Sequence, residues 1–336
     1  MQLTDILLLI LKFGGGLALI LKGADWLTDG ASAIARRFRI PSLVIGLTIV
    51  AFGTSAPEWV VSVVSAVHGQ TEMAIGNVIG SNIFNLLAIM GITALIAPVA
   101  CSAGNIRYDV PLCMLASVVL FAMAAPMPQV AGDGGIAAAT NMVSRRDGIV
   151  LLCFFAIFMT YTFAIARKGK AATEADDTGT EEAETPMWRA VVGVVAGLVG
   201  LIAGGNWMVD GAAGIASLMG VSQSVIALTI VAAGTSFPEL ITSVVAARKG
   251  DTDMAMGNVV GSNVFNIFLV LGSSAVVSPL SVGNLTLTDF ATLLGASALL
   301  WVFCQFGRRH HYITRSEGAV LTLCAIAYYT YAVVTA

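Results

Sequence analysis

The sequence predicts an all-α membrane protein whose ten transmembrane helices form two inverted repeats of five helices each. Two observations support this fold class. Apolar residues make up 57% of the chain and charged residues 11%, whereas about a quarter of the residues in a soluble domain are charged. The stretch 44–85 also returns without a gap at 225–266, at an offset of 181 residues (225 − 44). The composition indicates a chain embedded in lipid, and the repeat indicates duplication.

Ten apolar runs are long enough to cross a bilayer, because about 20 helical residues span about 30 Å of hydrocarbon. The first five runs lie at 4–28, 42–67, 73–97, 109–127 and 148–166. The second five lie at 188–218, 222–246, 254–278, 287–306 and 317–335. Since each half holds an odd number of helices, the second copy enters the membrane from the opposite face. Inverted repeats of this kind place a substrate near the midplane between the halves and predict alternating access.

A polar segment at 167–187 separates the two halves. It is rich in acidic residues and poor in aromatic ones, which is typical of a mobile linker. We therefore expect a first repeat at 1–166, a linker at 167–187 and a second repeat at 188–336.

Basic residues are distributed unevenly over the expected loops. Most of them, including Arg36 and Arg308, fall on one side, and only Arg145 and Arg146 fall on the other. The positive-inside rule makes the richer side cytoplasmic, together with the linker, and makes both termini periplasmic. This topology suits a bacterial inner membrane. The net charge of −3 is small and spread out, so we expect no nucleic-acid partner. We also expect the chain to contact the lipid bilayer and to be a monomer.

Each copy of the repeat carries one carboxylate in an apolar segment. Glu58 ends the sequence GTSAPE and Glu239 ends GTSFPE, at a depth where an ionised group costs roughly 2.5–3.5 kcal/mol. The proline kinks the helix and frees the carbonyl four residues earlier. Such carbonyls are tolerated in a membrane only when they are buried in protein or line a cavity. With the hydroxyls of Thr54, Ser55, Thr235 and Ser236, they would form an oxygen-only site of the kind that hard cations prefer.

The next helix of each copy carries a polar stripe. In GNVIGSNIFN at 76–85 and GNVVGSNVFN at 257–266, polar residues recur every four positions and share a helix face. We expect four of them to complete a cation's shell: Ser81, Asn85, Ser262 and Asn266. Hydrogen bonding between helices is the alternative explanation of the stripe, and bonding to the preceding turn is the alternative for the hydroxyls. Two ionised glutamates would neutralise one Ca²⁺ or two Na⁺ ions.

These doubled motifs resemble the two alpha repeats of the sodium/calcium exchangers, within the cation/calcium exchanger superfamily. The resemblance covers about 23–99 and 204–280 and implies exchange of Na⁺ for Ca²⁺, with no cofactor. By this resemblance Glu58 and Glu239 are the principal ligands of both ions. The resemblance further implies that the backbone carbonyls of Ala51 and Ala232 assist, with the side chains of Thr54, Ser55, Thr235, Ser236, Ser81, Asn85 and Ser262. The resemblance also implies that the first and sixth helices, at about 4–35 and 188–218, are long and slide.

The sequence departs from part of that family at Asn266, where some members hold an aspartate associated with K⁺ co-transport. The asparagine therefore argues against potassium dependence. Proton/calcium exchangers of the same superfamily carry a glutamate after the Gly-Asn of the second motif helix, whereas Val259 stands there in this chain. This difference favours Na⁺ as the driving ion.

Three other functions fit parts of the pattern. A proton/calcium exchanger is the first alternative, and a passive cation channel lined by the same oxygens is the second. An enzyme acting on a lipid phosphate is the third, but it would need basic residues at the depth of the phosphate. Because Arg and Lys are absent from 40–100, the sequence argues against the enzyme, and we expect a transporter.

Overall fold

The computed structural model describes residues 3–125, 129–130, 136–137, 142–175, 185–219, 234–283, 285–309 and 311–335, and nearly all of these are helical. The first half contains α1 (Leu3–Phe38), α2 (Ser42–Ile45), η1 (Gly46–Val50), α3 (Ala51–Thr54), α4 (Ala56–Val67), α5 (Thr71–Ile83), η2 (Phe84–Ile89), α6 (Met90–Ile96), η3 (Asn105–Asp109), α7 (Val110–Ala124) and α8 (Arg145–Ala175). The second half contains α9 (Met187–Leu218), α12 (Phe237–Arg248), α13 (Thr252–Phe265), η5 (Asn266–Leu271), α14 (Gly272–Val277), α15 (Leu287–Phe306) and α16 (Arg315–Thr335). The segments labelled η are π-helical turns within longer helices.

The apolar runs are confirmed as helices wherever the structure describes them. Eight helices within the described ranges are long and apolar enough to cross a membrane, and the bent pair Ser42–Thr54 and Ala56–Val67 makes a ninth span. The run expected at 222–246 is described only from residue 234, and its helix α12 continues to Arg248. Because the first part of this run lies outside the described residues, the count of ten helices stays a prediction.

Two helices extend well beyond their apolar runs. Helix α1 continues to Phe38, where the apolar run predicted an end at residue 28, and α8 continues to Ala175, where it predicted residue 166. Hydropathy marks only the part in hydrocarbon, whereas Ala, Lys, Arg and Glu continue a helix into water. The first part of the expected linker 167–187 is therefore helical, and 176–184 lie outside the described residues.

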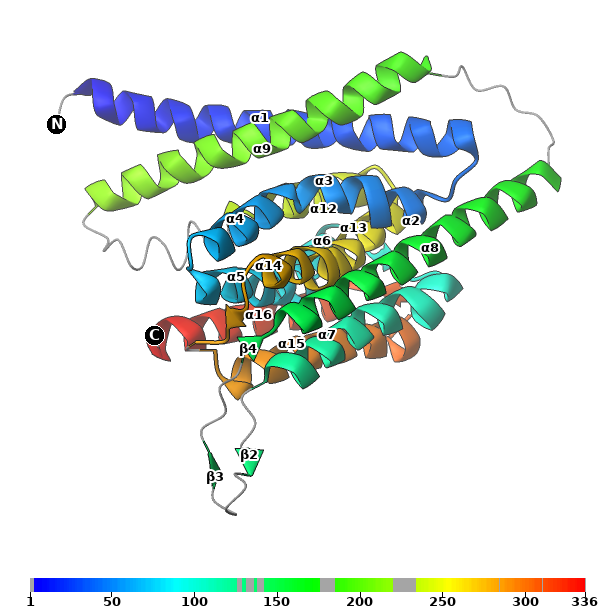
Figure 1. Ribbon diagram of the computed structural model, residues 1–336. Helices are drawn as coiled ribbons and strands as arrows, with labels where there is room; N and C mark the ends of the chain where they lie inside the picture. Colours follow the sequence, from blue (N-terminus) through cyan, green and yellow to red (C-terminus); the bar gives the residue numbers. More distant parts are fainter. Residues whose placement is uncertain are drawn as a thin grey trace.

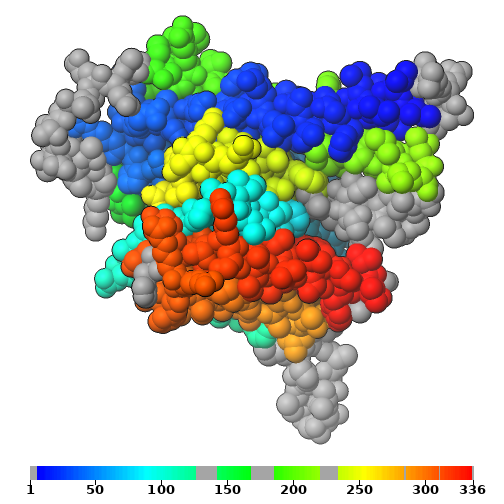
Figure 2. Space-filling model, turned by 180° about the vertical axis from the view of Figure 1, so that it is seen from behind, coloured from blue at the N-terminus to red at the C-terminus, as the bar shows by residue number. Residues whose placement is uncertain are grey.

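Helices α1 and α9 form a separate layer on one side of the molecule, where they run along each other (Figure 1). Their backbones approach closely through glycines. A Cβ atom on Gly16 would lie 2.5 Å from the backbone nitrogen of Met208, and one on Gly197 would lie 2.6 Å from that of Leu27. Such smooth faces allow close helix packing in lipid. Seen from behind, α1 lies across the molecule above the yellow surface that includes α12 (Figure 2).

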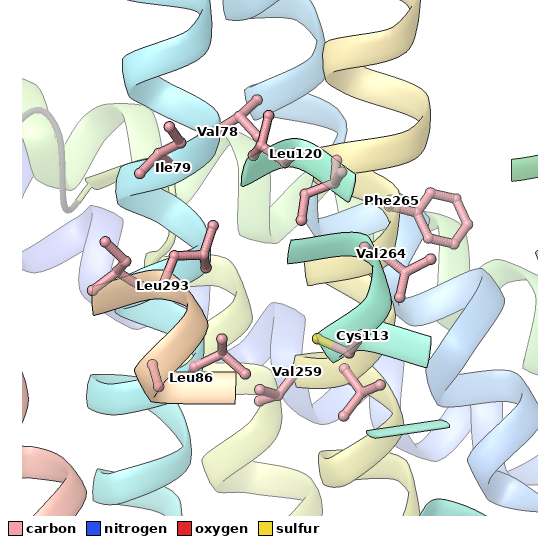
Figure 3. Close-up of a cluster of buried hydrophobic side chains, with 14 of the residues drawn as sticks. Val78, Ile79, Leu86, Cys113, Leu120, Val259, Val264, Phe265 and Leu293 are labelled. Carbon is pink, nitrogen blue, oxygen red and sulfur yellow. The ribbon is translucent and has the colours of Figure 1, made fainter. Parts of the chain in front are cut away.

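The remaining helices form the core of the molecule. Its centre is the pair of spans Thr71–Ile96 and Thr252–Val277, whose most apolar windows are 72% and 83% buried, against 17% for α1. Apolar side chains of α5 and α13 meet side chains of α7 and α15 there, among them Val78, Val259 and Leu293 (Figure 3). The two motif helices therefore have fixed neighbours on their apolar sides.

The two halves interlock through their last helices. Helix α16 packs on α6, and α8 packs on α14. Beside these contacts, β1 (Val99–Ala100) pairs with β6 (Tyr312–Ile313), and β4 (Met142–Val143) pairs with β5 (Leu280–Ser281). A third short pair joins β2 (Gln129–Val130) to β3 (Ile136–Ala137). Each half thus places its final helix against the third span of the other half, so the core is a single body.

Candidate functional site

The GTSAPE segment bends its helix, as its proline predicts. Helices α3 and α4 meet at Ser55 with a bend of 47° between their spans. Ser55 has φ −81° and ψ 3°, outside ordinary helix geometry. Pro57 lies in the first turn of α4, where a proline needs no hydrogen-bond partner. The second copy is similar, since Ser236 has φ −92° and ψ 3° just before α12. Each bend starts a new helix with a glutamate in its first turn.

Glu58 and Glu239 are both buried, with 1% of each residue exposed. Their position at the helix start is favourable for a carboxylate, because the partial positive charge of a helix lies at its N-terminus. The two halves exchange hydrogen bonds at this point. Ser55 Oγ donates to Glu239 Oε1 at 3.1 Å, and Ser236 Oγ donates to Glu58 Oε1 at 3.2 Å. These reciprocal bonds bring both glutamates and both serines into one site between the halves.

Several oxygens at this site have no hydrogen-bond partner among the residues that the structure describes. They include the second carboxylate oxygens of both glutamates, Glu58 Oε2 and Glu239 Oε2. Four further side chains of the stripes are buried with a partnerless oxygen: Ser81, Asn85, Ser262 and Asn266. Because a buried acceptor without a partner costs about 1–3 kcal/mol, these oxygens are candidates for binding a ligand with positive charge.

Some threonine hydroxyls and backbone carbonyls of the motif already have hydrogen-bond partners in the protein. Thr54 Oγ1 lies 3.1 Å from the carbonyl of Val50 and 3.4 Å from that of Ala51, so bonding to the preceding turn explains this hydroxyl in part. Thr235 lies against Glu58. The carbonyl of Ala51 accepts a hydrogen bond from the Ser55 N–H at 3.0 Å. A carbonyl oxygen has two lone pairs, so this bond does not prevent it from binding a cation as well. Ala232 lies outside the described residues, so its expected role stays a prediction.

The first residue of each stripe holds a glutamate's backbone. Asn258 Nδ2 donates to the carbonyl of Glu239 at 3.2 Å and to Ser243 Oγ at 2.9 Å. In the first copy, Asn77 Nδ2 donates to the carbonyl of Glu58 at 3.5 Å and to Ser62 Oγ at 3.0 Å. The stripe is therefore divided: its first member joins helices, while its later members keep partnerless oxygens.

The serines that bind Asn77 and Asn258 are not among the residues predicted from the sequence. The sequence motifs predict no role for Ser62 and Ser243, which lie beyond the GTSxPE motif. They nevertheless recur at the same offset of 181 residues (243 − 62). That recurrence was the available signal. Asn82 and Asn263 also recur, and they form a hydrogen bond across the halves, from Asn82 Nδ2 to the carbonyl of Asn263 at 3.3 Å.

Both stripes end in a π-helical turn. Asn85 lies in η2 and Asn266 begins η5. A π-turn inserts one residue into a helix and is frequent at functional sites, because it changes the direction of the side chains near it. Here the change affects the two asparagines whose oxygens lack partners among the described residues.

The two motif segments supply no positive charge within the membrane for the glutamates. Arg and Lys are absent from 40–100, and between 220 and 280 only Arg248 and Lys249 occur, at the end of α12. A buried charge needs a partner of opposite sign. The site can therefore hold one divalent or two monovalent cations when both carboxylates are ionised.

Comparisons with known proteins agree with this geometry. The description of the matching family is "Sodium/calcium exchanger protein", and the match covers residues 8–164 and 189–334. The chain is 32% identical over 339 residues to the sodium/calcium exchanger MaX1 of Methanosarcina acetivorans, covering 93% of this chain and 95% of the relative. It is 33% identical over 317 residues to the inner membrane protein YrbG of Escherichia coli (strain K12), covering 91% of each chain.

Among solved structures, the sodium-calcium exchanger NCX_Mj, soaked with 10 mM Na⁺ and zero Ca²⁺, superposes with a TM-score of 0.78. The two sequences are 29% identical, and the superposition covers 98% of this chain and 99% of that one.

Proposed function

The chain belongs to the sodium/calcium exchanger protein family, and we propose that it exchanges Na⁺ for Ca²⁺ through a site built on Glu58 and Glu239. It is an integral multi-pass membrane protein and a transporter, with the two ions as its cargo. One observation carries the proposed site: two buried glutamates from opposite halves bind each other's serine through one oxygen and keep the other oxygen without a described partner.

The chemistry of the donors supports Ca²⁺ and Na⁺ as the cargo. Ca²⁺ takes six to eight oxygen ligands, including carboxylates and amide carbonyls. Partnerless oxygens of these two kinds belong to Glu58, Glu239, Asn85 and Asn266, and the hydroxyl oxygens of Ser81 and Ser262 add to them. The carbonyls of Ala51 and Ala232 and the hydroxyls of Thr54, Ser55, Thr235 and Ser236 complete the proposed set. The two carboxylates balance one Ca²⁺ or two Na⁺, so the same site serves both ions in turn.

Alternating access follows from the layer formed by α1 and α9. These helices pack tightly against each other through glycine backbones, so they can move together as one unit. The core holds its two halves together through the buried serine and asparagine bonds of the site. We propose that the pair slides over this fixed core and exposes the site first to one side of the membrane and then to the other.

The proposed topology has ten helices in two inverted repeats, at 1–166 and 188–336, joined by the segment 167–187. The protein acts as a monomer in a bacterial inner membrane, with the joining segment in the cytoplasm and both termini in the periplasm. The basic residues of the expected loops support this orientation.

The test is uptake of ⁴⁵Ca²⁺ into proteoliposomes loaded with Na⁺ and diluted into Na⁺-free buffer. We expect rapid uptake by the unaltered protein and loss of at least 100-fold, roughly 2.7 kcal/mol or more, in Glu58→Gln and in Glu239→Gln. Glu72→Gln is the matched control, because Glu72 is exposed in the first turn of α5. Its uptake should equal that of the unaltered protein.

Three outcomes contradict the proposal in different ways. Uptake that persists in either glutamine variant rejects the two-glutamate site. Uptake that ignores Na⁺ but follows an imposed pH gradient indicates exchange for protons. Uptake that requires neither gradient indicates a channel.

A further inference from the structure

We propose that Asn82 is a positioning residue that turns the amide oxygen of Asn266 toward the transported cation. This inference rests on the proposed function, since it concerns the same site. An asparagine side chain ends in an oxygen, which attracts a cation, and in an NH₂ group, which repels one. Without a fixed partner the amide can present either end. Asn82 removes this freedom from Asn266.

The orientation of Asn82 follows from a backbone group. The carbonyl of Asn263 can only accept a hydrogen bond, so the atom of Asn82 that lies 3.3 Å from it must be the NH₂ nitrogen. The other end of the Asn82 amide is then its oxygen, which can only accept. This oxygen lies 3.1 Å from the side chain of Asn266. The nearer end of Asn266 must therefore be its NH₂ group, and its oxygen points away from Asn82.

Asn266 belongs to the same polar stripe as Asn258, whose side chain contacts the backbone of a glutamate. Asn258, Ser262 and Asn266 follow one another at intervals of four residues and share a helix face. Asn258, the first of them, contacts both halves of the site: it binds the carbonyl of Glu239 and accepts from Thr54 Oγ1 at 3.2 Å. Asn266 Oδ1 is buried and has no hydrogen-bond partner within the described part of the chain. These observations agree with an oxygen that is kept for a cation.

Within the described ranges, the other half has no equivalent of this hydrogen-bond chain. Asn263 occupies the position that corresponds to Asn82, but its NH₂ group donates to the carbonyl of Val259 in its own helix at 2.7 Å. Asn85, which corresponds to Asn266, has neither amide atom bonded to a described residue. Of the two asparagines, Asn266 alone is therefore oriented by a described neighbour. Within the described part of the chain, one of the two equivalent amides is thus held by a neighbour and the other is not.

The test measures the KM for Ca²⁺ in Na⁺-driven uptake for Asn82→Ala and for the larger Asn82→Leu. The smaller alanine side chain cannot clash with its neighbours, so Asn82→Ala can still be measured if Asn82→Leu fails to fold. We expect the KM to rise about tenfold with a maximal rate within about twofold, because a ligand is misdirected while transport steps remain. Thr162→Val is the control for loss of a buried polar group, since the Thr162 hydroxyl bonds within its own helix, to the carbonyl of Phe158. Its KM should not change.

Introducing Asn82→Ala into the Asn266→Asp variant tests whether Asn82 acts by orienting Asn266 or only by packing against it. In Asn266→Asp both side-chain ends are oxygens, so orientation no longer matters, and the Asn82 oxygen would even face another acceptor. Adding Asn82→Ala to this variant should leave the KM unchanged or lower it. Adding Asn82→Ala to Asn85→Asp should still raise the KM about tenfold, because Asn82 does not hold Asn85.

The results distinguish this inference from the proposed function. The role of Asn82 would be overturned if Asn82→Ala raised the KM equally in the unaltered protein and in the Asn266→Asp variant. It would also be overturned if neither single Asn82 variant raised the KM. If Glu58→Gln abolishes exchange in the same preparations, only this inference has then failed. If Glu58→Gln retains exchange, the two-glutamate site itself is rejected.

Discussion

The two copies of the motif form the same bond to each other's glutamate, but the asparagines behind the glutamates differ in their burial and contacts. Ser55 donates to the carboxylate of Glu239 at 3.1 Å and Ser236 donates to that of Glu58 at 3.2 Å, so the two bonds are nearly equal in length. Behind them, Asn258 is fully buried and takes part in bonds to three residues, whereas Asn77 is only partly buried and binds two. Duplication thus preserved the residues that touch the carboxylates and the asparagines that support them, but the surroundings of the two asparagines differ.

The largest difference between the copies should appear when the supporting asparagines are removed. Asn258→Ala removes bonds to the carbonyl of Glu239 and to Ser243 Oγ, and a contact with Thr54 Oγ1, at a fully buried position, so we expect a loss of about 2–3 kcal/mol in the free energy of unfolding. Asn77→Ala should cost about 1 kcal/mol, because its bond to Glu58 is long, at 3.5 Å, and its surroundings are less buried. Thermal unfolding in detergent, followed by tryptophan fluorescence, measures both.

Equal losses in these two variants would break the comparison. They would mean that the supporting asparagines are equivalent in solution and that the difference in their contacts carries no energy. Ser297→Ala is a suitable reference for background effects, because the Ser297 hydroxyl is buried and bonds within its own helix, to the carbonyl of Leu294.

The serines should behave alike, in contrast to the asparagines. Ser55→Ala and Ser236→Ala each remove one hydrogen bond to a buried carboxylate, for which about 1.5 kcal/mol is typical. We expect the KM for Ca²⁺ to rise about tenfold in each variant, and by a similar factor in both. Uptake of ⁴⁵Ca²⁺ at a fixed Na⁺ gradient measures this. A rise in only one variant would show that a single glutamate dominates binding.

The sequence predicted the groups that touch the carboxylates better than the groups that support them. Repetition and burial cost marked Glu58 and Glu239, and the proline marked the bend at Ser55. By contrast, Ser55 bonds a residue 184 positions away, and local sequence carries no information about such a pairing. The orientation of Asn266 depends in turn on a backbone carbonyl of another residue, Asn263, through Asn82. Tertiary packing decides these contacts, whereas composition and periodicity report only on single helices.

The limits of the helices show the same division. The apolar run 287–306 agrees with α15 at both ends. Its start is fixed by a capping box, in which Thr286 is the N-cap and Asp289 is the third residue of the helix. Helix α8 instead passes nine residues beyond its apolar run (175 − 166), to Ala175. No strong helix breaker ends it at the edge of the hydrocarbon, so hydropathy alone could not predict its length.

The smallest difference between the copies concerns their exposed ends. Lys249 lies 2.8 Å from Asp29 and 3.1 Å from Asp25, and so ties α1 to the end of α12. The equivalent position in the first half is His68 (249 − 181), which is exposed. Asp210, the equivalent of Asp29, instead pairs with Lys12 at 3.3 Å, between α1 and α9. Only one end of the helix pair is therefore tied to the core by these residues.

Lys249→Met should lower the free energy of unfolding by about 0.5–1 kcal/mol, because exposed ion pairs contribute little, and His68→Met should leave it unchanged. Burial lowers the pKa of Lys249, but hydrogen bonds and charges from Asp29 and Asp25 outweigh burial and raise it above its ordinary value of 10.5. A group with a raised pKa stabilises the fold fully below its unfolded pKa and loses this effect as the pH rises through the folded pKa. The difference between Lys249→Met and the unaltered protein should thus be constant from about pH 6 to about 9 and shrink above about 10.5. A difference that varies near neutral pH would assign the tie to another group.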